Sequence, residues 1–455
     1  MKIIIIGVGK VGYTVAEQLA GEKHDVVLVD TDREALSDAL STLDVISIHG
    51  NGATSEVQKA AGAEDAQLVI ALTGSDELNL LCCLIAKKLG VKSAIARVRN
   101  PEYHNDLKIF SDTLGLTMAV NPEYEAALEI LRILKFPTAI NVDAFSKGRI
   151  DLVSFGVVGE CTLAGKKVKE SFSNDDYDVL ACAVERHDEV FIPNGDFVIE
   201  SGDVVAAMIH PEQINPFFKH IGNPVKRVKK VMIVGGGVIA EYLTEQLMSL
   251  NMDVTIVEKN HDVAERLSFL FPRANIVCAD GTNRSLLLEE GLCTMDALCS
   301  LTGFDEENIL LSLYAKIQNP DIKTITKVNK MAFQEVTAVL DIGSVVYPKY
   351  TTANKILQHV RARQNNVTSN VETLYKIIDN KVEALEFRVG EDSAACGKML
   401  MELKLKKGVL IGSVTRDKKP FIPHGRDRLQ AGDLVVVVTT IAGLSDFDSI
   451  LGDTI

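Results

Sequence analysis

A glycine-rich motif that occurs twice limits the possible folds of this chain more than any other feature. An apolar run from Ile3 ends in GVGKVG at residues 7–12, and a second run from Met232 ends in GGGVIA at residues 235–240. In this pattern the first glycine allows a tight turn and the second lets backbone N–H groups approach a diphosphate. The third lets the next helix pack closely on its strand, and alanine is a common substitute there. Both copies therefore predict a strand, a phosphate-binding turn and a helix. The alternative for either copy alone is a glycine turn that only packs a helix.

An acidic residue follows each motif at the same spacing. Apolar runs typical of strands end at Asp30 and at Glu258. An acid at this place accepts hydrogen bonds from the ribose hydroxyls of a bound dinucleotide. Because a carboxylate repels a 2′-phosphate, the two acids favour NAD or an adenosine nucleotide over NADP, although Arg33 and Lys259 nearby weaken this inference.

The whole pattern recurs, which predicts a tandem duplication. Residues of the first half match residues of the second half at a nearly constant offset of 228 to 230 positions. The matched pairs are Gly7 and Gly235, Asp30 and Glu258, Gly52 and Gly281, Thr73 and Thr302, Arg97 and Lys327, Pro193 and Pro423, and Asp203 and Asp433. Since the pairs fall in two kinds of segment, the duplicated unit itself has two parts.

The repeat predicts four domains. Strand-like runs at 2–6, 26–29, 45–48, 68–71, 94–98 and 117–120 alternate with helical stretches, as in a doubly wound parallel sheet. Shorter strand signals at 152–158, 179–184 and 204–209 indicate a small strand-rich module. We therefore predict an α/β fold with two Rossmann-like doubly wound parallel-sheet lobes, each followed by a small α+β lobe, with bounds 1–140, 141–225, 226–370 and 371–455. The basic run 226–230 is either a linker or the solvated start of a strand.

One predicted helix needs a partner beyond its own sheet. Residues 123–134, which follow Asn121 and Pro122, are apolar on more than one face. We expect this helix, and its counterpart after Pro348, to bury an apolar face against another nucleotide lobe, in the same chain or in a second one.

The predicted binding residues lie where strands end, because ligands of doubly wound sheets bind beyond the carboxyl ends of the strands. Arg97 is a candidate forked donor to phosphates, with a surface ion pair as the alternative, and Lys10 is a candidate partner of a terminal phosphate. In the first lobe the predicted site residues are Gly7, Val8, Gly9, Lys10, Val11, Gly12, Asp30, Asn51, Gly52, Thr73, Gly74 and Arg97. In the second lobe they are Gly235, Gly236, Gly237, Val238, Ile239, Glu258, Asp280, Gly281, Thr302, Gly303 and Lys327.

Composition excludes several classes of protein. A net charge of −14, the absence of Trp and an aromatic content of 5% argue against nucleic-acid binding. The longest apolar runs are far shorter than the ~20 residues that cross a bilayer, so we expect a cytosolic chain. Its 8 cysteines include no C-x-x-C pair, which indicates buried thiols in a reducing compartment.

Catalytic and metal sites are not predicted. An oxidoreductase needs an acid or base beside the nicotinamide, but the small lobes hold only the isolated histidines His187, His210 and His424, and neither His210 nor His424 has a matching carboxylate or cysteine in the other repeat. The acidic stretch 174–178 is either a cation loop or, as we favour, a solvated turn, since it lacks the Gly and the terminal Glu of an EF-hand.

Taken together, these residues resemble a known family. The glycine turn with Asp30, the Asn51-Gly52 and Thr73-Gly74 turns, Arg97 and the Asn121-Pro122-Glu123 helix start are similar to RCK (KTN) domains, which regulate potassium channels and transporters. Two such units in one chain resemble the peripheral cytosolic subunits of Trk-type potassium uptake systems.

The resemblance implies a partner, an assembly and a ligand. The partner is an integral-membrane potassium transport subunit of the TrkH/TrkG type, on the inner face of the cell membrane. The assembly is a homo-oligomer, dimer or tetramer, that forms a regulatory ring. The ligands are NAD(H) and, as a further candidate, ATP and ADP, bound by the site residues named above. Ala240 and Asp280 depart from the first copy, so occupancy of the second lobe stays open.

Two functions remain from the sequence. The favoured one is a non-enzymatic subunit that converts nucleotide binding into rearrangement of subunits. The alternative is an NAD-dependent oxidoreductase with Rossmann domains.

Overall fold

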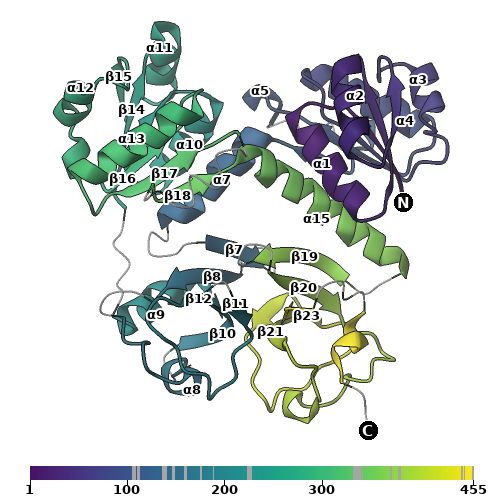
Figure 1. Cartoon of the computed structure of the whole chain (residues 1–455), viewed down its shortest axis with the longest axis vertical. Coiled ribbons are helices and arrows are strands. Elements are labelled where there is room, and N and C mark those ends of the chain that lie inside the picture. Colours follow the sequence, from purple (N-terminus) through teal and green to yellow (C-terminus); the bar gives the residue numbers. More distant parts are fainter. Residues whose placement is uncertain are drawn as a thin grey trace. The chain divides into compact units, whose positions relative to one another are not determined.

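The computed structural model describes residues 1–104, 109, 113–135, 141–145, 149–157, 161–174, 177–187, 189–222, 228–330, 340, 342–368, 371–377, 381–441, 444 and 446–452. The chain forms two compact units, and each unit combines both halves of the sequence: Met1–Leu134 with Val228–Leu357, and Lys135–Arg227 with Gln358–Ile455. The first unit holds two parallel sheets and the second holds two antiparallel sheets (Figure 1). Within the described residues, no helix combines the length and the apolarity that a membrane span requires.

The first lobe is a six-stranded parallel sheet in the order β3-β2-β1-β4-β5-β6. Its strands are β1 (Lys2–Ile6), β2 (Asp25–Asp30), β3 (Ile46–His49), β4 (Leu68–Ala71), β5 (Ser93–Arg97) and β6 (Met118–Val120). Its helices include α1 (Lys10–Gly21), α2 (Arg33–Thr42), α3 (Ser55–Ala60), α4 (Asp76–Lys88) and α5 (Pro101–His104). Strands β1 and β4 are buried along nearly their whole length, which is why they read as continuous apolar runs rather than alternating ones.

The second lobe repeats this sheet in the same order, β15-β14-β13-β16-β17-β18. Its strands are β13 (Lys230–Val234), β14 (Asp253–Glu258), β15 (Asn275–Cys278), β16 (Ala297–Ser300), β17 (Lys323–Lys327) and β18 (Ser344–Val346), and its helices include α10 (Val238–Ser249), α11 (His261–Leu270), α12 (Arg284–Glu289) and α13 (Asp305–Gln318). The predicted fold class and the duplication are confirmed. Lys230 begins β13, so the end of the basic run is the start of a strand, whereas residues 226–227 lie outside the described part.

A helix of the first lobe packs on the core of the second lobe. Helix α7 (Pro122–Lys135) buries Ile130 and Leu134 in one cluster with Ile233, Leu243 and Ile325. These last three side chains belong to β13, α10 and β17. The prediction that this helix packs against another nucleotide lobe is confirmed, and within the described chain that lobe is the second one.

Polar contacts fix the same junction. The side chain of Asn121 donates to the hydroxyl of Tyr242 at 2.9 Å. Helix α15 (Pro348–Thr368), the counterpart of α7, donates from Thr351 to the Glu129 carboxylate of α7 at 2.5 Å. The two nucleotide lobes are therefore joined by apolar packing and by hydrogen bonds from Asn121 to α10 and from α15 to α7.

The small lobes form two antiparallel sheets (Figure 1). The first has the order β11-β10-β12-β8-β7, with β9 paired to β10, and the second has the order β19-β20-β23-β21-β22. The first lobe contains β7 (Asn141–Phe145), β8 (Ile150–Gly156), β9 (Ser173–Asn174), β10 (Tyr177–Arg186), β11 (Glu189–Phe191) and β12 (Val204–Ile209), with α8 (Val168–Ser171) and α9 (Ile214–His220). The second contains β19 (Val371–Ile377), β20 (Val382–Arg388), β21 (Val409–Arg416), β22 (Lys419–Phe421) and β23 (Leu434–Thr439). One apolar cluster, which includes Phe145, Met208, Val382 and Val438, joins the two lobes. The acidic stretch 174–178 runs from β9 to β10, and its residues 175–176 lie outside the described part.

The repeated Gly-Asp pair of the small lobes has a structural role. Asp203 accepts hydrogen bonds from Arg186 Nε and Nη2 at 2.8 and 2.7 Å and from the Glu200 backbone at 2.8 Å. Asp433 accepts the matching bonds from Arg416. A buried carboxylate with a bidentate arginine holds the turn before the strand in place, so this pair is not a candidate for ligand binding.

The expectation of buried thiols is wrong for part of the chain. Cys82, Cys182 and Cys299 are buried, but Cys278 and Cys293 are exposed. Burial raises the pKa of the Cys82 thiol to about 12, which suppresses the reactive thiolate.

Candidate functional site

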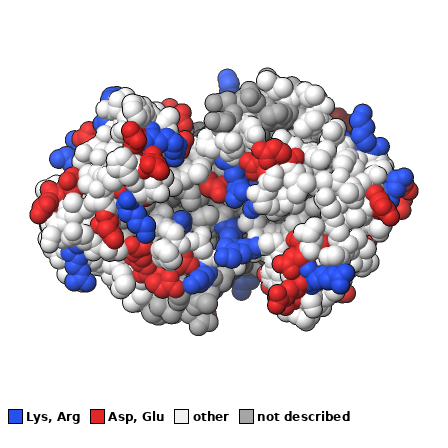
Figure 2. Space-filling model, turned by 90° about the horizontal axis from the view of Figure 1, so that it is seen from above, with Lys and Arg blue, Asp and Glu red and all other residues white. Residues whose placement is uncertain are grey.

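A cavity of about 670 Å³ opens beyond the carboxyl ends of β1, β2, β4 and β5 in the first lobe. Most of the site residues predicted there line it: Gly7, Gly9, Lys10, Val11, Asp30, Asn51, Gly52, Thr73, Gly74 and Arg97. Val8 and Gly12 are the predicted residues that do not. Figure 2 shows Lys and Arg side chains gathered in the hollow at the centre of the view. The cavity therefore combines a glycine turn with positive charge.

The glycine turn is shaped by two kinds of requirement. Gly7 has φ +97°, and a Cβ there would lie 2.7 Å from the Leu72 carbonyl carbon, so only glycine fits. A Cβ on Gly12 would lie 2.0 Å from the Gly7 oxygen, which explains why this glycine is needed for helix packing although it does not line the cavity.

Gly9 is different, because nothing in the described part of the chain requires it to be glycine. An added Cβ would meet no described atom within 4 Å, and φ is an ordinary −67°. Gly9 caps the start of α1, where the first N–H groups of the helix have no partner within the helix. Open space at such a helix start suits a phosphate group.

The predicted acid holds the turn itself. Asp30 accepts from the Val8 N–H at 2.6 Å and from the Asp32 N–H at 2.9 Å. Glu258 accepts from Gly236 at 2.6 Å and from Asn260 at 2.7 Å in the same way. Each carboxylate oxygen keeps acceptor capacity, so ribose binding is compatible with this structural role.

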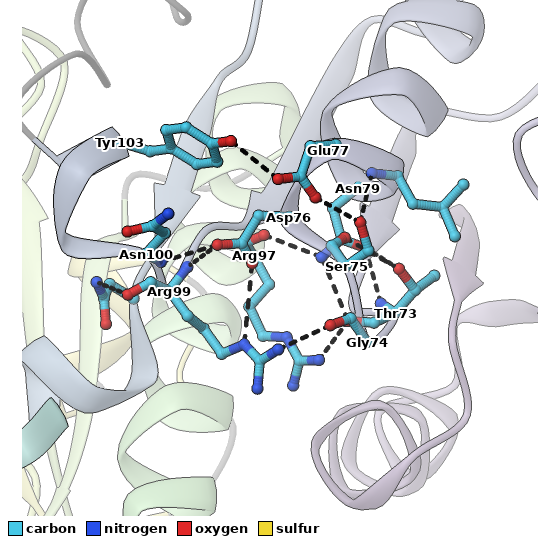
Figure 3. Close-up of polar contacts among 12 residues, drawn as sticks. Thr73, Gly74, Ser75, Asp76, Glu77, Asn79, Arg97, Arg99, Asn100 and Tyr103 are labelled. Atoms are coloured by element: carbon cyan, nitrogen blue, oxygen red, sulfur yellow. Dashed lines mark hydrogen bonds and ion pairs between the residues drawn. The ribbon is translucent and has the colours of Figure 1, made fainter. Parts of the chain in front are cut away.

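An asparagine that the sequence analysis did not identify holds the turn at Thr73 and Gly74 in place. Asn79 of α4 is fully buried and accepts from the Thr73 N–H and hydroxyl at 2.8 and 2.7 Å. Its amide donates to the Arg97 carbonyl at 2.9 Å, so it ties the end of β4 to the end of β5 (Figure 3). Asn308 makes the matching bonds to Thr302 and to Lys327 in the second lobe. The recurrence of this asparagine at the same spacing after Thr73 and Thr302 is the signal that could have found it.

Two arginines point into the same space (Figure 3). Arg97 donates from Nη2 to the Thr73 carbonyl, and Arg99, which the sequence reasoning missed, donates from Nη2 to the Gly74 carbonyl at 2.7 Å. Burial lowers the pKa of Arg97, and the neighbouring charge of Arg99 lowers it further. Asp76 holds this segment by accepting from the Arg99 and Asn100 N–H groups at 2.8 Å each.

The second lobe keeps the turn but lacks two cations of the first lobe. Gly235 has φ +100°, and an added Cβ on Gly237 would meet no described atom within 4 Å. Lys327 donates to the Leu301 carbonyl at 3.1 Å, and burial lowers its pKa. At the positions of Lys10 and Arg99, the second lobe has Val238 and Asn329.

The other predicted residues of the second lobe form the turns around this site. Asp280 accepts from the Thr282 N–H and hydroxyl at 2.9 and 2.7 Å. Cβ atoms on Gly236 and Gly281 would lie 2.7 Å from Leu267 and 2.2 Å from Val234, whereas Gly303 has open space. Ile239 is buried in the core.

The second lobe also contributes to the cavity of the first. Asn329, Pro348 and Lys349 line it together with Glu123 of α7. Lys349 donates to the Asn329 carbonyl. These residues are distant in sequence from the first glycine turn, so their presence depends on how the two lobes pack.

Two domain families account for most of the chain. The TrkA-N domain matches residues 3–122 and 231–348, and the TrkA-C domain matches residues 152–222 and 384–452. The chain belongs to the TrkA family. It is 32% identical to Trk system potassium uptake protein TrkA homolog 1 of Methanosarcina mazei, over 98% of this chain and 99% of that protein. It is 31% identical to Trk system potassium uptake protein TrkA of Halomonas elongata, over 96% of this chain and 95% of that protein.

Solved structures share the fold of this TrkA family member. The GsuK channel superposes with a TM-score of 0.64 at 18% identity, over 96% of this chain and 76% of that one. The GsuK RCK domain gives a TM-score of 0.63 at 18% identity, over 96% and 92% of the two chains. The tandem of nucleotide lobe and small lobe is therefore an architecture also found in an RCK protein.

Metal binding has no support in the described part of the chain, where no three His, Cys, Asp or Glu residues are arranged to hold an ion.

Proposed function

We propose that this TrkA family member is a nucleotide-sensing regulatory subunit that gates a membrane potassium uptake protein of the TrkH/TrkG type. The observation that carries the proposal is the first-lobe cavity, where an open glycine turn, an acid and several cations meet residues of the second lobe. A ligand in this cavity touches both lobes and is able to change how they sit against each other. Such a change is the output that a regulatory subunit needs.

The ligand is a nucleotide with a diphosphate, NAD(H) in the first place and ATP or ADP as further candidates. The glycine turn and the start of α1 suit the phosphates, and Asp30 suits the ribose hydroxyls. Arg97 and Lys10 supply positive charge at the phosphate end. A solved relative in fold, the GsuK channel, has a structure bound to NAD, which supports the choice of ligand without fixing it.

The second lobe is a separate site with the same turn geometry. Gly237, Glu258, Thr302 and Lys327 occupy the places of the first-lobe residues. The absence of cations at the positions of Lys10 and Arg99 predicts weaker binding of ligands that end in a phosphate.

The assembly is a homo-oligomeric ring, dimer or tetramer, at the inner face of the cell membrane. The family and the RCK architecture support this arrangement. The described residues leave apolar side chains exposed on α13, where Leu310 is 66% and Ile317 is 75% exposed, and a contact between subunits would cover them.

Isothermal titration calorimetry on the full chain tests nucleotide binding. NAD⁺, NADH, ADP and ATP are titrated into wild type, Gly9→Val and Gly237→Val. Since a Cβ at either glycine enters open space, both variants should fold normally and each should silence its own lobe. Binding that survives in both single variants and in the double variant would refute the assignment of the glycine turns.

Two further measurements separate regulation from catalysis. Transport by vesicles that contain the membrane subunit should depend on the added nucleotide, and this dependence should be lost in the double glycine variant. The absorbance of NADH at its nicotinamide band should stay constant with the protein present. Oxidation of NADH with a stoichiometric acceptor would favour the alternative, an NAD-dependent oxidoreductase.

A further inference from the structure

Glu123 is a carboxylate in a cavity that is otherwise suited to phosphates. It is the second residue of α7 and lines the first-lobe cavity together with Arg97 and Arg99. Its Oε2 atom is buried and has no hydrogen-bond partner among the described residues. Burial raises the pKa of this carboxyl, although its own backbone N–H and the two guanidinium groups act in the opposite direction. The carboxylate is therefore stabilised by its own backbone N–H and by the charges of the two arginines.

The two arginines also keep unused capacity. Each donates one described hydrogen bond from Nη2 to a carbonyl at the end of β4, while the Nε atoms of Arg97 and Arg99 are buried without a hydrogen-bond partner. Arg99 Nε lies 3.8 Å from Asp76 Oδ1, a distance of an ion pair rather than of a hydrogen bond. The same two guanidinium groups are therefore available both to the Glu123 carboxylate and to a phosphate that enters the cavity.

Matching positions of the two repeats bring side chains of opposite charge to the first-lobe cavity. The start of α7 reads Pro122-Glu123, and the matching start of α15 reads Pro348-Lys349. Both Glu123 and Lys349 line the same cavity. The charge of Glu123 also acts on Lys327 of the second lobe, whose pKa it raises against the effect of burial. Glu123 therefore lies among cations from both lobes.

We propose that Glu123 sets the selectivity of the first-lobe site by the charge at the phosphate end of the ligand. This inference rests on the nucleotide site proposed above. The carboxylate competes with ligand phosphates for Arg97 and Arg99, and it repels a terminal phosphate. A dinucleotide such as NAD⁺, whose phosphates are both esterified, meets less repulsion than ADP or ATP, whose terminal phosphate carries extra negative charge. Lys349 acts in the opposite direction.

The test compares affinities for NAD⁺ and ADP in the full chain that carries Gly237→Val, so that the second lobe is silent. Calorimetric titrations are made with EDTA present for the parent, Glu123→Gln and Glu125→Gln. Glu125 lies on the same helix but pairs with Lys355 at 3.5 Å and is not part of the cavity wall, so it controls for loss of a carboxylate. Melting curves establish that each variant is folded.

Glu123→Gln should raise the affinity for ADP on the order of tenfold, as expected when one charge several ångströms from a phosphate is removed in a partly buried site. The affinity for NAD⁺ should change much less, and Glu125→Gln should leave both unchanged. Lys349→Gln should lower the affinity for ADP relative to NAD⁺, which keeps the proposal testable if Glu123→Gln does not fold.

An unchanged ratio of ADP to NAD⁺ affinity in folded Glu123→Gln, or a fall in its ADP affinity, would overturn this inference alone. If the parent binds neither nucleotide, the proposed function fails instead.

Discussion

Ile130 joins the two nucleotide lobes, and its replacement by alanine measures how strongly they are joined. The side chain is 0% exposed and lies in one cluster with Ile233 and Leu243 of the second lobe. Ile→Ala removes buried methyl and methylene groups and leaves a cavity, which costs about 2–5 kcal/mol in protein cores. Because the surrounding side chains are fixed in a sheet and in α10, the site collapses poorly. We therefore expect a loss of about 3–4 kcal/mol, in the upper half of that range.

Hydrogen exchange followed by mass spectrometry locates this loss. If the cost falls on the junction, amide protection of β13 and β16 should decrease by roughly 100-fold or more, since about 1.4 kcal/mol corresponds to a factor of ten. Leu81→Ala on α4, where the side chain is 45% exposed, is the matched control and should change protection little. The reasoning is refuted if β13 and β16 keep their protection while β1 and β4 lose theirs, because α7 would then pack on its own sheet.

Three other changes test the site and the junction. Asp30→Ala should weaken NAD(H) binding by about 1.5–3 kcal/mol, through loss of a charge-assisted bond to ribose and release of the Val8 N–H; unchanged affinity by calorimetry would exclude the ribose role. Changing both Lys10 and Arg97 to Gln should flatten the difference between ATP and ADP in vesicle transport while association with the membrane subunit persists; a preserved difference would place phosphate sensing elsewhere. Burial raises the pKa of Glu129, so its folded pKa lies above its unfolded one, and the stability that it confers is present at low pH and is lost as pH rises through the folded pKa. Glu129→Gln should therefore raise the melting temperature, measured by calorimetry, at pH 8 and change it little near pH 4. An equal rise in melting temperature at both pH values would contradict this account.

The sheets and the glycine turns were predictable because their determinants are local. Continuous apolar runs identify buried parallel strands, and β1, β4 and β12 have the predicted bounds. The positive φ of Gly7 admits only glycine, and the close approach of Gly12 to the Gly7 oxygen leaves no room for a large side chain, so the motif is a direct record of backbone geometry. The duplication strengthened each prediction, because a chance match to the glycine motif or to its spaced acid would have had to occur in both halves of the chain. The four domain boundaries themselves stay predictions.

The missed elements and residues depend on contacts far along the chain. Strand β11 is short and lies at an edge, where few apolar side chains are needed and periodicity carries little information. β7, also missed, is likewise an edge strand of this sheet. Arg99 lies two residues beyond a predicted site residue, and nothing in its surroundings marks it as different from a surface arginine. Lys349 enters the cavity of the first lobe only because α15 and α7 pack together, and no single stretch of sequence contains that information.

The duplication also explains why the two nucleotide sites need not respond alike. The backbone of the two turns is the same, with open space at Gly9 and at Gly237, but the phosphate end has Lys10 and Arg99 in one lobe and Val238 and Asn329 in the other. A ligand shifts a conformational equilibrium only by its difference in affinity for the two states. Because Lys349 of the second lobe lines the first-lobe cavity, we expect the phosphate charge of a ligand bound there to act on the junction between the lobes. We propose that the second site, which lacks cations at these two positions, distinguishes ligands less by that charge.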